Sequence, residues 1–319
     1  MSDCKESCQE KFKTLIGGQA LIEGILMQGP EKRAIVVRTK DGLVSKEEPV
    51  IKRTGILTWP LIRGVYNFGC SMTSGVKALM YSADYFAEDE EPVEPGKFEK
   101  WFEKTFGSDK LEKAVIGFSV FLGIAMSVGL FILLPTLLSG IFDSWVHNSV
   151  LRSVIEGILR IAIFMGYLIG VSKTKDMKRV FAYHGAEHKT IRCYEARLPL
   201  TTENVKPMTR LHPRCGTSFL FVVVILSIFL FALVSTVIPA ENMFVRLLVR
   251  LALLPIVVAV SYEINRFVGR HDNWFTRILT APGMWMQNFT TNEPDESMIE
   301  VAIEALSRVI PQEEGTDRW

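Results

Sequence analysis

The sequence predicts a mainly α-helical, polytopic membrane protein with four transmembrane helices and a small N-terminal α+β part that contains a β-hairpin. Two runs, residues 114–140 and 217–240, contain no charged residue and are long enough to cross a bilayer as helices. Of the 319 residues, 48% are hydrophobic and 22% are charged, which excludes a disordered chain because such chains have too little apolar surface to bury. The net charge of +1 offers no bulk attraction for a polyanion, so we expect no nucleic-acid partner.

The N-terminal part begins with an apolar segment, residues 15–30, which is followed by a hairpin pattern. Residues 34–39 and 43–48 flank a Lys-Asp-Gly turn, and Asp-Gly readily supplies the positive φ angles that a tight turn needs. The glycine-rich segment 15–30 is too short to span a bilayer comfortably, so we expect it to be buried or re-entrant. Glu23 inside it needs a partner, which is either a functional group or an ordinary buried hydrogen bond.

Two further helices are predicted outside the membrane spans. Residues 60–86 carry apolar side chains at helical spacing, which predicts an amphipathic helix on the bilayer or on the sheet. Residues 294–310 show the same pattern after a proline, which predicts a C-terminal helix. Residues 87–96 combine five acidic residues with two prolines and predict a solvated linker before the first span.

Two weaker spans, residues 154–171 and 247–262, return the chain across the bilayer. The first contains Glu156 and Arg160, which lie four apart on one helix face, and the second contains Arg250. In one interpretation these charges line a polar groove inside the membrane. In the other they have a structural role, because they form an ion pair or reach toward the headgroups. The sequence leaves both interpretations open.

The loops between the spans set the predicted orientation. Residues 172–216 contain ten Lys and Arg residues, whereas residues 141–153 contain only Arg152. Because positively charged loops stay inside, we expect a multi-pass protein of the cytoplasmic membrane whose termini and long loop are cytosolic. All five cysteines would then lie on the reducing, cytosolic side, and their odd number agrees with this because disulfides, which are rare in the cytosol, pair cysteines two by two. The predicted organisation is a polar tail (1–14), a membrane-associated cytosolic α+β region (15–86), the acidic linker (87–96), a four-helix transmembrane domain (97–290) and a C-terminal amphipathic helix with its tail (291–319).

The long loop contains the string H-x-x-E-H within a helical pattern over residues 176–194. His184 and His188 lie four residues apart on one helix face, so both can bind one metal ion. Glu187 lies beside them, where a carboxylate can act as general base on a water molecule. This spacing predicts a hydrolytic metal centre.

Such a centre needs a third protein ligand, and the candidates are His212, Cys215 and Glu195. The expected cofactor is a divalent metal, with Zn²⁺ as the first candidate. The opposing interpretation is a basic helix that contacts anionic headgroups and whose histidines make ordinary hydrogen bonds. Weaker candidates are a cysteine nucleophile, Cys193 near His188, and a metal or redox pair, Cys4 with Cys8.

Several strings occur in a fixed order along the chain: Gly17-Gly18-Gln19-Ala20-Leu21-Ile22-Glu23-Gly24, His184-Gly185-Ala186-Glu187-His188-Lys189-Thr190, Glu203-Asn204-Val205, His212-Pro213-Arg214-Cys215-Gly216-Thr217-Ser218-Phe219 and Thr290-Thr291-Asn292-Glu293-Pro294. Together they resemble the YqhQ-like family of bacterial membrane proteins, a group of unknown function, over residues 15–310. The resemblance implies a metal-dependent enzyme that uses the same His and Glu residues. It also implies a link to translation or membrane-protein biogenesis, because genes of this family often neighbour those for peptide-chain release factor and its methyltransferase.

Two functions from different classes follow from these patterns. The first is a metal-dependent hydrolase of a peptide or lipid-linked bond that uses the H-x-x-E-H residues. The second is a non-enzymatic biogenesis or quality-control factor near the translocation machinery, in which the intramembrane charges form a groove for client membrane proteins. The lipid bilayer is a partner in both, and transport is a weaker third function because four spans would need to oligomerise.

Overall fold

The computed structural model describes residues 12–51, 53–87, 108–142, 145–146, 148–237, 242–271, 273–313 and 315–318. The contacts within the chain divide it into two compact units. One, called the sheet unit, comprises Met1–Tyr85, Leu168–Val222 and Val258–Trp319, and the other, called the span unit, comprises Phe86–Tyr167 and Val223–Val257. Three long helices continue from one unit into the other, α5 (Ser149–Ser172), α8 (Gly216–Val237) and α9 (Met243–Arg270), and the last two residues of α1 (Ile62–Ala87) also belong to the span unit.

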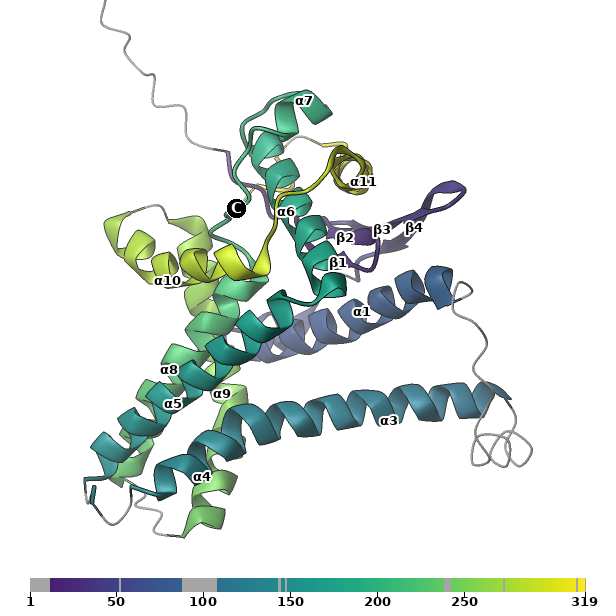
Figure 1. The fold of residues 1–319 in the computed structure, drawn as a ribbon. Helices are drawn as coiled ribbons and strands as arrows, with labels where there is room; N and C mark the ends of the chain where they lie inside the picture. The colour runs from purple at the N-terminus through teal and green to yellow at the C-terminus, as the bar shows by residue number, and fades with distance from the viewer. Residues whose placement is uncertain are drawn as a thin grey trace, which may run out of the picture. The chain divides into compact units, whose positions relative to one another are not determined.

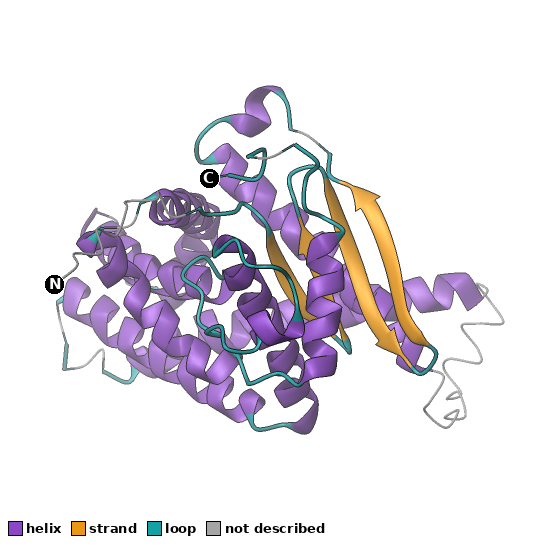
Figure 2. Ribbon diagram, turned by 90° about the horizontal axis from the view of Figure 1, so that it is seen from above, coloured by secondary structure: helices purple, strands orange, loops and turns teal. Residues whose placement is uncertain are grey.

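The sheet unit contains four antiparallel strands in the order of the sequence (Figures 1 and 2). They are β1 (Gly17–Leu21), β2 (Gly24–Gln28), β3 (Lys32–Thr39) and β4 (Gly42–Pro49). The predicted hairpin is confirmed, because β3 pairs with β4 and Gly42 supplies a positive φ of +129° at the turn. The apolar segment 15–30 forms the other hairpin, in which β1 pairs with β2. Strand β2 pairs with β1 on one side and β3 on the other, which satisfies its backbone groups, and it is buried from Gly24 to Met27.

Helices α6 (Lys175–Glu195) and α11 (Glu296–Ser307) pack against the sheet and complete the core of this unit (Figure 1). Core side chains from strands and helices include Ile25, Val36, Tyr183, Ile191, Val301 and Leu306. The C-terminal helix is confirmed and begins at Glu296, because the carboxylate of Asp295 caps it by accepting the Met298 amide at 3.0 Å. The helix predicted over residues 176–194 is confirmed as α6.

The amphipathic helix predicted over residues 60–86 is confirmed as α1 (Ile62–Ala87), which follows a short 3₁₀ turn, η1 (Gly55–Thr58). It begins two residues later than the proline suggested, because Leu61 has a φ of +68° that no right-handed helix allows. Several of its apolar side chains, including Val65 and Met72, are exposed on the described surface. This exposure agrees with a helix that lies on a bilayer.

Two helices of the sheet unit were not predicted, α7 (Thr202–Val205) and α10 (Trp274–Thr290). Helix α10 begins at a capping box in which Asn273 and Thr276 exchange hydrogen bonds between side chain and backbone. Pro282 lies inside this helix, and an internal proline normally argues against a helix. The cap and the packing of its buried face outweigh that signal.

Four helical stretches in the described part of the chain are long and apolar enough to cross a membrane, as predicted. They are Ala114–Gly140, Val150–Ser172, Gly216–Val237 and Phe244–Arg270. The first consists of α3 (Ser108–Val128), a π-helical turn, η2 (Gly129–Leu133), and α4 (Leu134–Gly140). The fourth span is longer than the predicted residues 247–262. Glu263 ended the apolar run in the sequence, but in the structure it lies within α9 and pairs with Arg63 of α1.

The charges predicted inside two spans meet within the span unit. Glu156 accepts a hydrogen bond from Arg160 Nη2 at 2.8 Å and forms an ion pair with Arg250. Arg250 also donates to Thr136 at 2.6 Å, and Arg160 donates to Ser227 at 3.0 Å. Glu156 is 1% exposed and each arginine is 5% exposed. These contacts favour a structural ion-pair network over an open groove.

Some predictions concern residues outside the described part of the chain. Cys4, Cys8 and the acidic linker beyond Ala87 belong to this group. The cytosolic orientation of the loops stays a prediction.

Candidate metal centre

Helix α6 holds the H-x-x-E-H string in the interior of the sheet unit. His188 is 1% exposed and Glu187 is 4% exposed. Gly185 lets α6 approach the segment that follows α10, because a Cβ at this position would overlap the Asn292 carbonyl oxygen. The Asn292 amide donates to the Phe181 carbonyl at 2.8 Å. This close packing brings the end of α10 next to the first histidine of the string.

Cys215, the residue before α8, joins the two histidines. The ligand atoms of His184, His188 and Cys215 all lie within 4.8 Å of one another, and His184 Nε2 is 3.2 Å from Cys215 Sγ. Tetrahedral Zn²⁺ holds nitrogen and sulfur ligands about 3.3–3.6 Å apart. Small side-chain movements would therefore place all three ligand atoms around one ion.

Both histidines are oriented by backbone carbonyls. His184 Nδ1 donates to the Thr290 carbonyl at 2.7 Å, and His188 Nδ1 donates to the Arg210 carbonyl at 2.6 Å. Because a carbonyl can only accept, Nδ1 carries a proton in each ring, and Nε2 is the ligand atom of the neutral ring. Histidines that bind metals are commonly oriented by a second hydrogen bond of this kind.

The electrostatics of the cluster favour a cysteine thiolate. Burial alone would raise the pKa of Cys215, but the adjacent His184 and His188 lower it well below its ordinary value. Burial likewise disfavours a charged His184, yet the neighbouring thiolate raises the pKa of His184 to about 9. Without a metal, protonated His184 neutralises the thiolate, and a metal ion must displace that proton to bind.

Glu187 is a buried carboxylate with one oxygen, Oε2, that has no hydrogen-bond partner among the described residues. Burial raises the pKa of Glu187, although the nearby His184 and His188 oppose the shift. Gly18 of β1 leaves room for this carboxylate, because a Cβ there would lie 3.0 Å from Glu187 Cδ. An unpartnered buried carboxylate is costly, and a pKa that is raised by burial is typical of functional sites.

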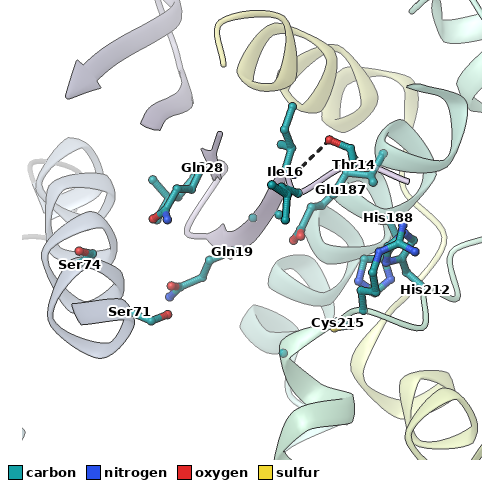
Figure 3. A pocket seen from close by; sticks show the side chains of 17 residues that line it. Thr14, Ile16, Gln19, Gln28, Ser71, Ser74, Glu187, His188, His212 and Cys215 are labelled. Atoms are coloured by element: carbon teal, nitrogen blue, oxygen red, sulfur yellow. Dashed lines mark hydrogen bonds between the residues drawn. The ribbon is translucent and has the colours of Figure 1, made fainter. Parts of the chain in front are cut away.

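A cavity of about 250 Å³ opens in front of this carboxylate (Figure 3). Glu187, His188 and Cys215 contribute to its lining. Polar side chains of β1, β2 and α1 add to the same lining: Gln19, Gln28, Ser71 and Ser74. Figure 3 shows Glu187 directed into this space, with His188, His212 and Cys215 grouped to one side of it. A space of this size admits one end of a substrate.

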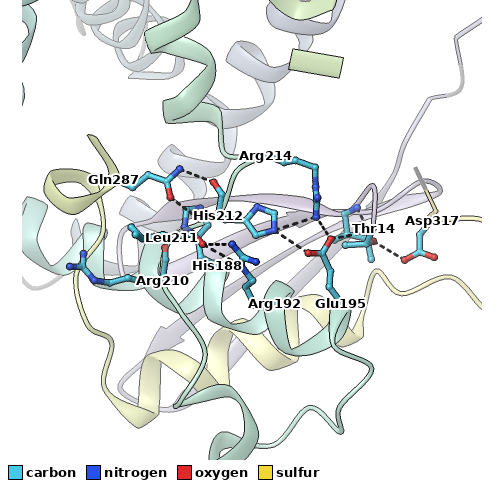
Figure 4. Close-up of polar contacts among 11 residues, drawn as sticks. Thr14, His188, Arg192, Glu195, Arg210, Leu211, His212, Arg214, Gln287 and Asp317 are labelled. Atoms are coloured by element: carbon cyan, nitrogen blue, oxygen red, sulfur yellow. Dashed lines mark hydrogen bonds and ion pairs between the residues drawn. The ribbon is translucent and has the colours of Figure 1, made fainter. Parts of the chain in front are cut away.

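His212, another candidate ligand, lies against Glu195 and outside the three-residue cluster (Figure 4). Its Nε2 is 3.4 Å from the Glu195 carboxylate, which also pairs with Arg214. Burial lowers the pKa of His212 to about 4 despite the Glu195 carboxylate, so this ring is neutral at neutral pH. Burial opposes a charged Glu195, but His212 and Arg214 lower the pKa of that carboxyl. His212 and Glu195 thus use each other as partners.

The sequence did not reveal the residues that hold the loop before α8 in place. Gln287 of α10 is 0% exposed; its side chain accepts from the His212 amide and donates to the His212 carbonyl, both at 2.7 Å. The signal that could have marked Gln287 is an amide side chain that directly follows the apolar residues 284–286 of α10. Thr290 and Arg210 orient the histidines through backbone carbonyls, which no side-chain pattern reveals.

Two other candidates of the sequence have different surroundings. Glu23, at the β1–β2 turn, pairs with Arg179 and accepts from the Tyr183 hydroxyl at 3.1 Å. Cys193 is buried, and burial raises the pKa of its thiol, which does not favour a nucleophile.

Comparisons with known proteins agree with the resemblance seen in the sequence. The model of one family, described as a protein of unknown function (DUF1385), matches residues 59–312. The chain is 33% identical over 310 residues to the uncharacterized protein YqhQ of Bacillus subtilis (strain 168), and the match covers 95% of this chain and 94% of that protein. No solved structure is significantly similar to the chain.

Proposed function

The chain belongs to the DUF1385 family, and we propose that it is a metal-dependent hydrolase of the cytoplasmic membrane. The ligands in this proposal are His184, His188 and Cys215, and the general base is Glu187. The observation that carries it is the free oxygen of buried Glu187 beside three ligands, two of which are already oriented. The substrate class that we propose is a peptide or a lipid-linked compound.

The donor set suits a catalytic Zn²⁺ site. Two imidazole nitrogens and one thiolate are ligands that Zn²⁺ prefers, and three protein ligands leave the fourth tetrahedral position open. A structural zinc site would instead have four protein ligands. His212, which is near enough to be considered as the fourth, is 3.4 Å from the Glu195 carboxylate. The set therefore supports a site with one open position.

Glu187 provides the acid–base chemistry of the proposed reaction. A bound Zn²⁺ would act as a Lewis acid that makes water more acidic and polarises the bond to be cleaved. Glu187 accepts the proton of water, and its raised pKa brings this carboxyl closer to neutral pH than an ordinary glutamate. The water oxygen bonds to the electrophilic carbon or phosphorus, and Glu187 returns the proton to the leaving group as its bond breaks.

We place the centre at the cytosolic surface of the membrane. The ten Lys and Arg residues of the segment 172–216 support a cytosolic loop. Cys215 directly precedes the span that begins at Gly216, so the cluster lies where a helix leaves the bilayer. A substrate could reach it from the lipid or from the cytosol.

The test uses a strain that lacks the gene and is complemented with the parent or a variant. Glu187→Gln keeps the size of the side chain and removes the base, so we expect bound metal to be retained and uncleaved substrates to accumulate. Untargeted mass spectrometry of membrane peptides and lipids measures that accumulation. Glu203→Gln, at an exposed carboxylate of the same loop, is the matched control and should match the parent. Identical pools in the parent and Glu187→Gln would refute the role of Glu187 as a base.

A further inference from the structure

Strand β1 lies at one edge of the sheet and carries backbone groups that no neighbouring strand uses. The strand order is β1-β2-β3-β4, and among the described residues β1 pairs only with β2. Leu21 and Gly24 flank a two-residue turn, so they form a hydrogen-bonded pair. Bonded and non-bonded pairs alternate along an antiparallel ladder. The backbone groups of Gly18 and Ala20 therefore point away from β2.

This outward edge of β1 lies at the cavity in front of Glu187 (Figure 3). Residues 16–19 line that cavity together with Glu187 and His188. The Gly18 amide is close enough to the Glu187 carboxyl to form a hydrogen bond with it, which agrees with its outward direction. In the described part of the chain, the Gly18 carbonyl and the outward groups of Ala20 have no hydrogen bond.

No side chain of β1 obstructs the edge where it meets the cavity. Gly17 and Gly18 are exposed, and a Cβ at Gly17 would have no atom within 4 Å. The unpartnered Oε2 atom of buried Glu187 is directed into the same space. A backbone that enters the cavity can therefore lie along β1 and reach this carboxylate.

The opposite edge strand, β4, is protected against pairing in ways that β1 is not. Thr39 and Gly42 flank a two-residue turn, so the same alternation directs Pro49, which has no amide hydrogen, toward the outer edge of β4. Strand β4 also carries three charged side chains in succession: Lys46, Glu47 and Glu48. Strand β1, with the sequence Gly-Gly-Gln-Ala-Leu, contains neither proline nor charge. Because prolines and charges are the usual protection of an edge strand, the bare edge beside Glu187 is suited to binding another strand.

We propose that β1 binds a peptide substrate as an added, extended strand whose scissile bond faces Glu187. This inference rests on the proposed function and selects the peptide from its two substrate classes. An extended peptide presents a donor and an acceptor on one edge at every second residue, which matches Gly18 and Ala20. A lipid-linked compound has no such repeat. The cavity also favours a peptide main chain over an acyl chain, because its lining includes several polar side chains: Thr14, Gln19, Gln28, Ser71 and Ser74.

The β1 edge positions the substrate and takes no part in the proton transfers. The water oxygen bonds to the carbonyl carbon of the scissile peptide bond, and Glu187 accepts one proton of that water. The C–N bond then breaks, and the amine leaves with the proton that Glu187 returns.

The test measures binding separately from cleavage. Full-length Glu187→Gln protein in detergent, reconstituted with Zn²⁺, is incubated with short random peptides that are blocked at both ends. Bound peptides are identified by mass spectrometry, and the most enriched peptide is labelled with fluorescein. Its dissociation constant is measured by fluorescence anisotropy, first unmodified and then with each backbone amide N-methylated in turn.

N-methylation should weaken binding at every second residue of the central part of the peptide. We expect a loss of about five- to tenfold where the amide faces β1, because one hydrogen bond is removed. The intervening amides face away from β1, and their N-methylation should have little effect. This result needs no change to the protein, so it does not depend on how well a variant folds.

Two proline variants test the same contact from the side of the protein. Ala20→Pro removes an outward amide hydrogen and no bond to β2, and it should weaken binding about five- to tenfold. Ser45→Pro removes the corresponding outward amide of β4 and is the matched control; it should bind like the parent. Thermal unfolding shows that both variants are folded.

Failure of this inference can be told apart from failure of the proposed function. No enriched peptide, losses without a two-residue period, or equal binding by folded Ala20→Pro and Ser45→Pro would overturn the β1 site. Cleavage of a lipid-linked compound without peptide binding would also overturn it, while the hydrolase would stand. Periodic binding of a peptide that the parent protein does not cleave would support the β1 site and count against the hydrolase.

Discussion

Gly18→Ala tests how closely strand β1 approaches Glu187. A Cβ at Gly18 would lie 2.7 Å from the Leu26 carbonyl oxygen and 2.9 Å from Met27 Sδ. Carbon and oxygen atoms in contact are ordinarily about 3.3–3.6 Å apart, so the two strands would have to separate by about 0.6 Å. Glu187 Cδ, 3.0 Å from the same position, would also have to move.

Overpacking of this kind costs about 1–3 kcal/mol, whereas alanine in place of an unobstructed strand glycine gains about 0.5–1 kcal/mol. Gly17, the neighbouring residue of β1, has no atom within 4 Å of its Cβ position, so Gly17→Ala is the matched control. The assay is thermal unfolding in one detergent at one heating rate, followed by tryptophan fluorescence.

Because 1 kcal/mol corresponds to roughly 2–4 °C, Gly18→Ala should unfold several degrees below the parent. Gly17→Ala should unfold at or above the temperature of the parent. A Gly18→Ala variant that is as stable as Gly17→Ala would refute the close packing of β1 against Glu187.

Three further predictions concern the metal, α10 and the span unit. Metal affinity should rise about tenfold per pH unit up to about pH 9 and then level off, because below the His184 pKa of about 9 the metal must displace a proton. Competition with a metal indicator at several pH values checks this, and a pH-independent affinity would contradict it. Gln287→Leu should lower the free energy of unfolding by about 1–3 kcal/mol, because the buried His212 amide and carbonyl lose their partner. Thermal unfolding beside the exposed control Asn288→Leu measures the loss, and equal stability of the two variants would count against it. Glu156→Ala should cost about 3–5 kcal/mol, because Arg160 and Arg250 lose their buried counter-charge. The same assay should show a loss of about 0.5 kcal/mol or less for Glu304→Ala, at a half-exposed pair on α11, and comparable losses would argue against the network.

The spans could be predicted because a helix in lipid must satisfy its backbone internally and present apolar side chains. Residues 114–140 contain no charge, and the observed span has the same limits. The end of the fourth span was harder to predict. Glu263 reads as a boundary in sequence, but its ion pair with Arg63, 200 residues away, lets α9 continue.

The first hairpin shows a limit of periodicity. Residues 15–30 are apolar on both faces and interrupted by glycines, so they lack the alternation that marks a strand. Their assignment to the sheet depends on pairing with β3, which the sequence does not reveal locally. Helix α10 was missed for a related reason, because Pro282 and several aromatic residues conceal its helical pattern.

The candidate site was predicted in its local part. The spacing of His184 and His188 places both on one helix face, and α6 confirms that arrangement. The choice among third ligands depends on tertiary structure, because His212 and Cys215 are only three residues apart. Gln287 and Glu195 hold His212 away from the cluster while Cys215 enters it.

Elemental mass spectrometry of the full-length protein, purified in detergent without a histidine tag, tests the metal centre most directly. We expect about one metal ion per chain in the parent and in His271→Ala, which changes an exposed histidine outside the cluster. The metal should be lost from the His184→Ala/His188→Ala double variant, provided that this variant still unfolds cooperatively. A parent that binds no metal after reconstitution with Zn²⁺, or a double variant that retains the full amount, would contradict the assignment.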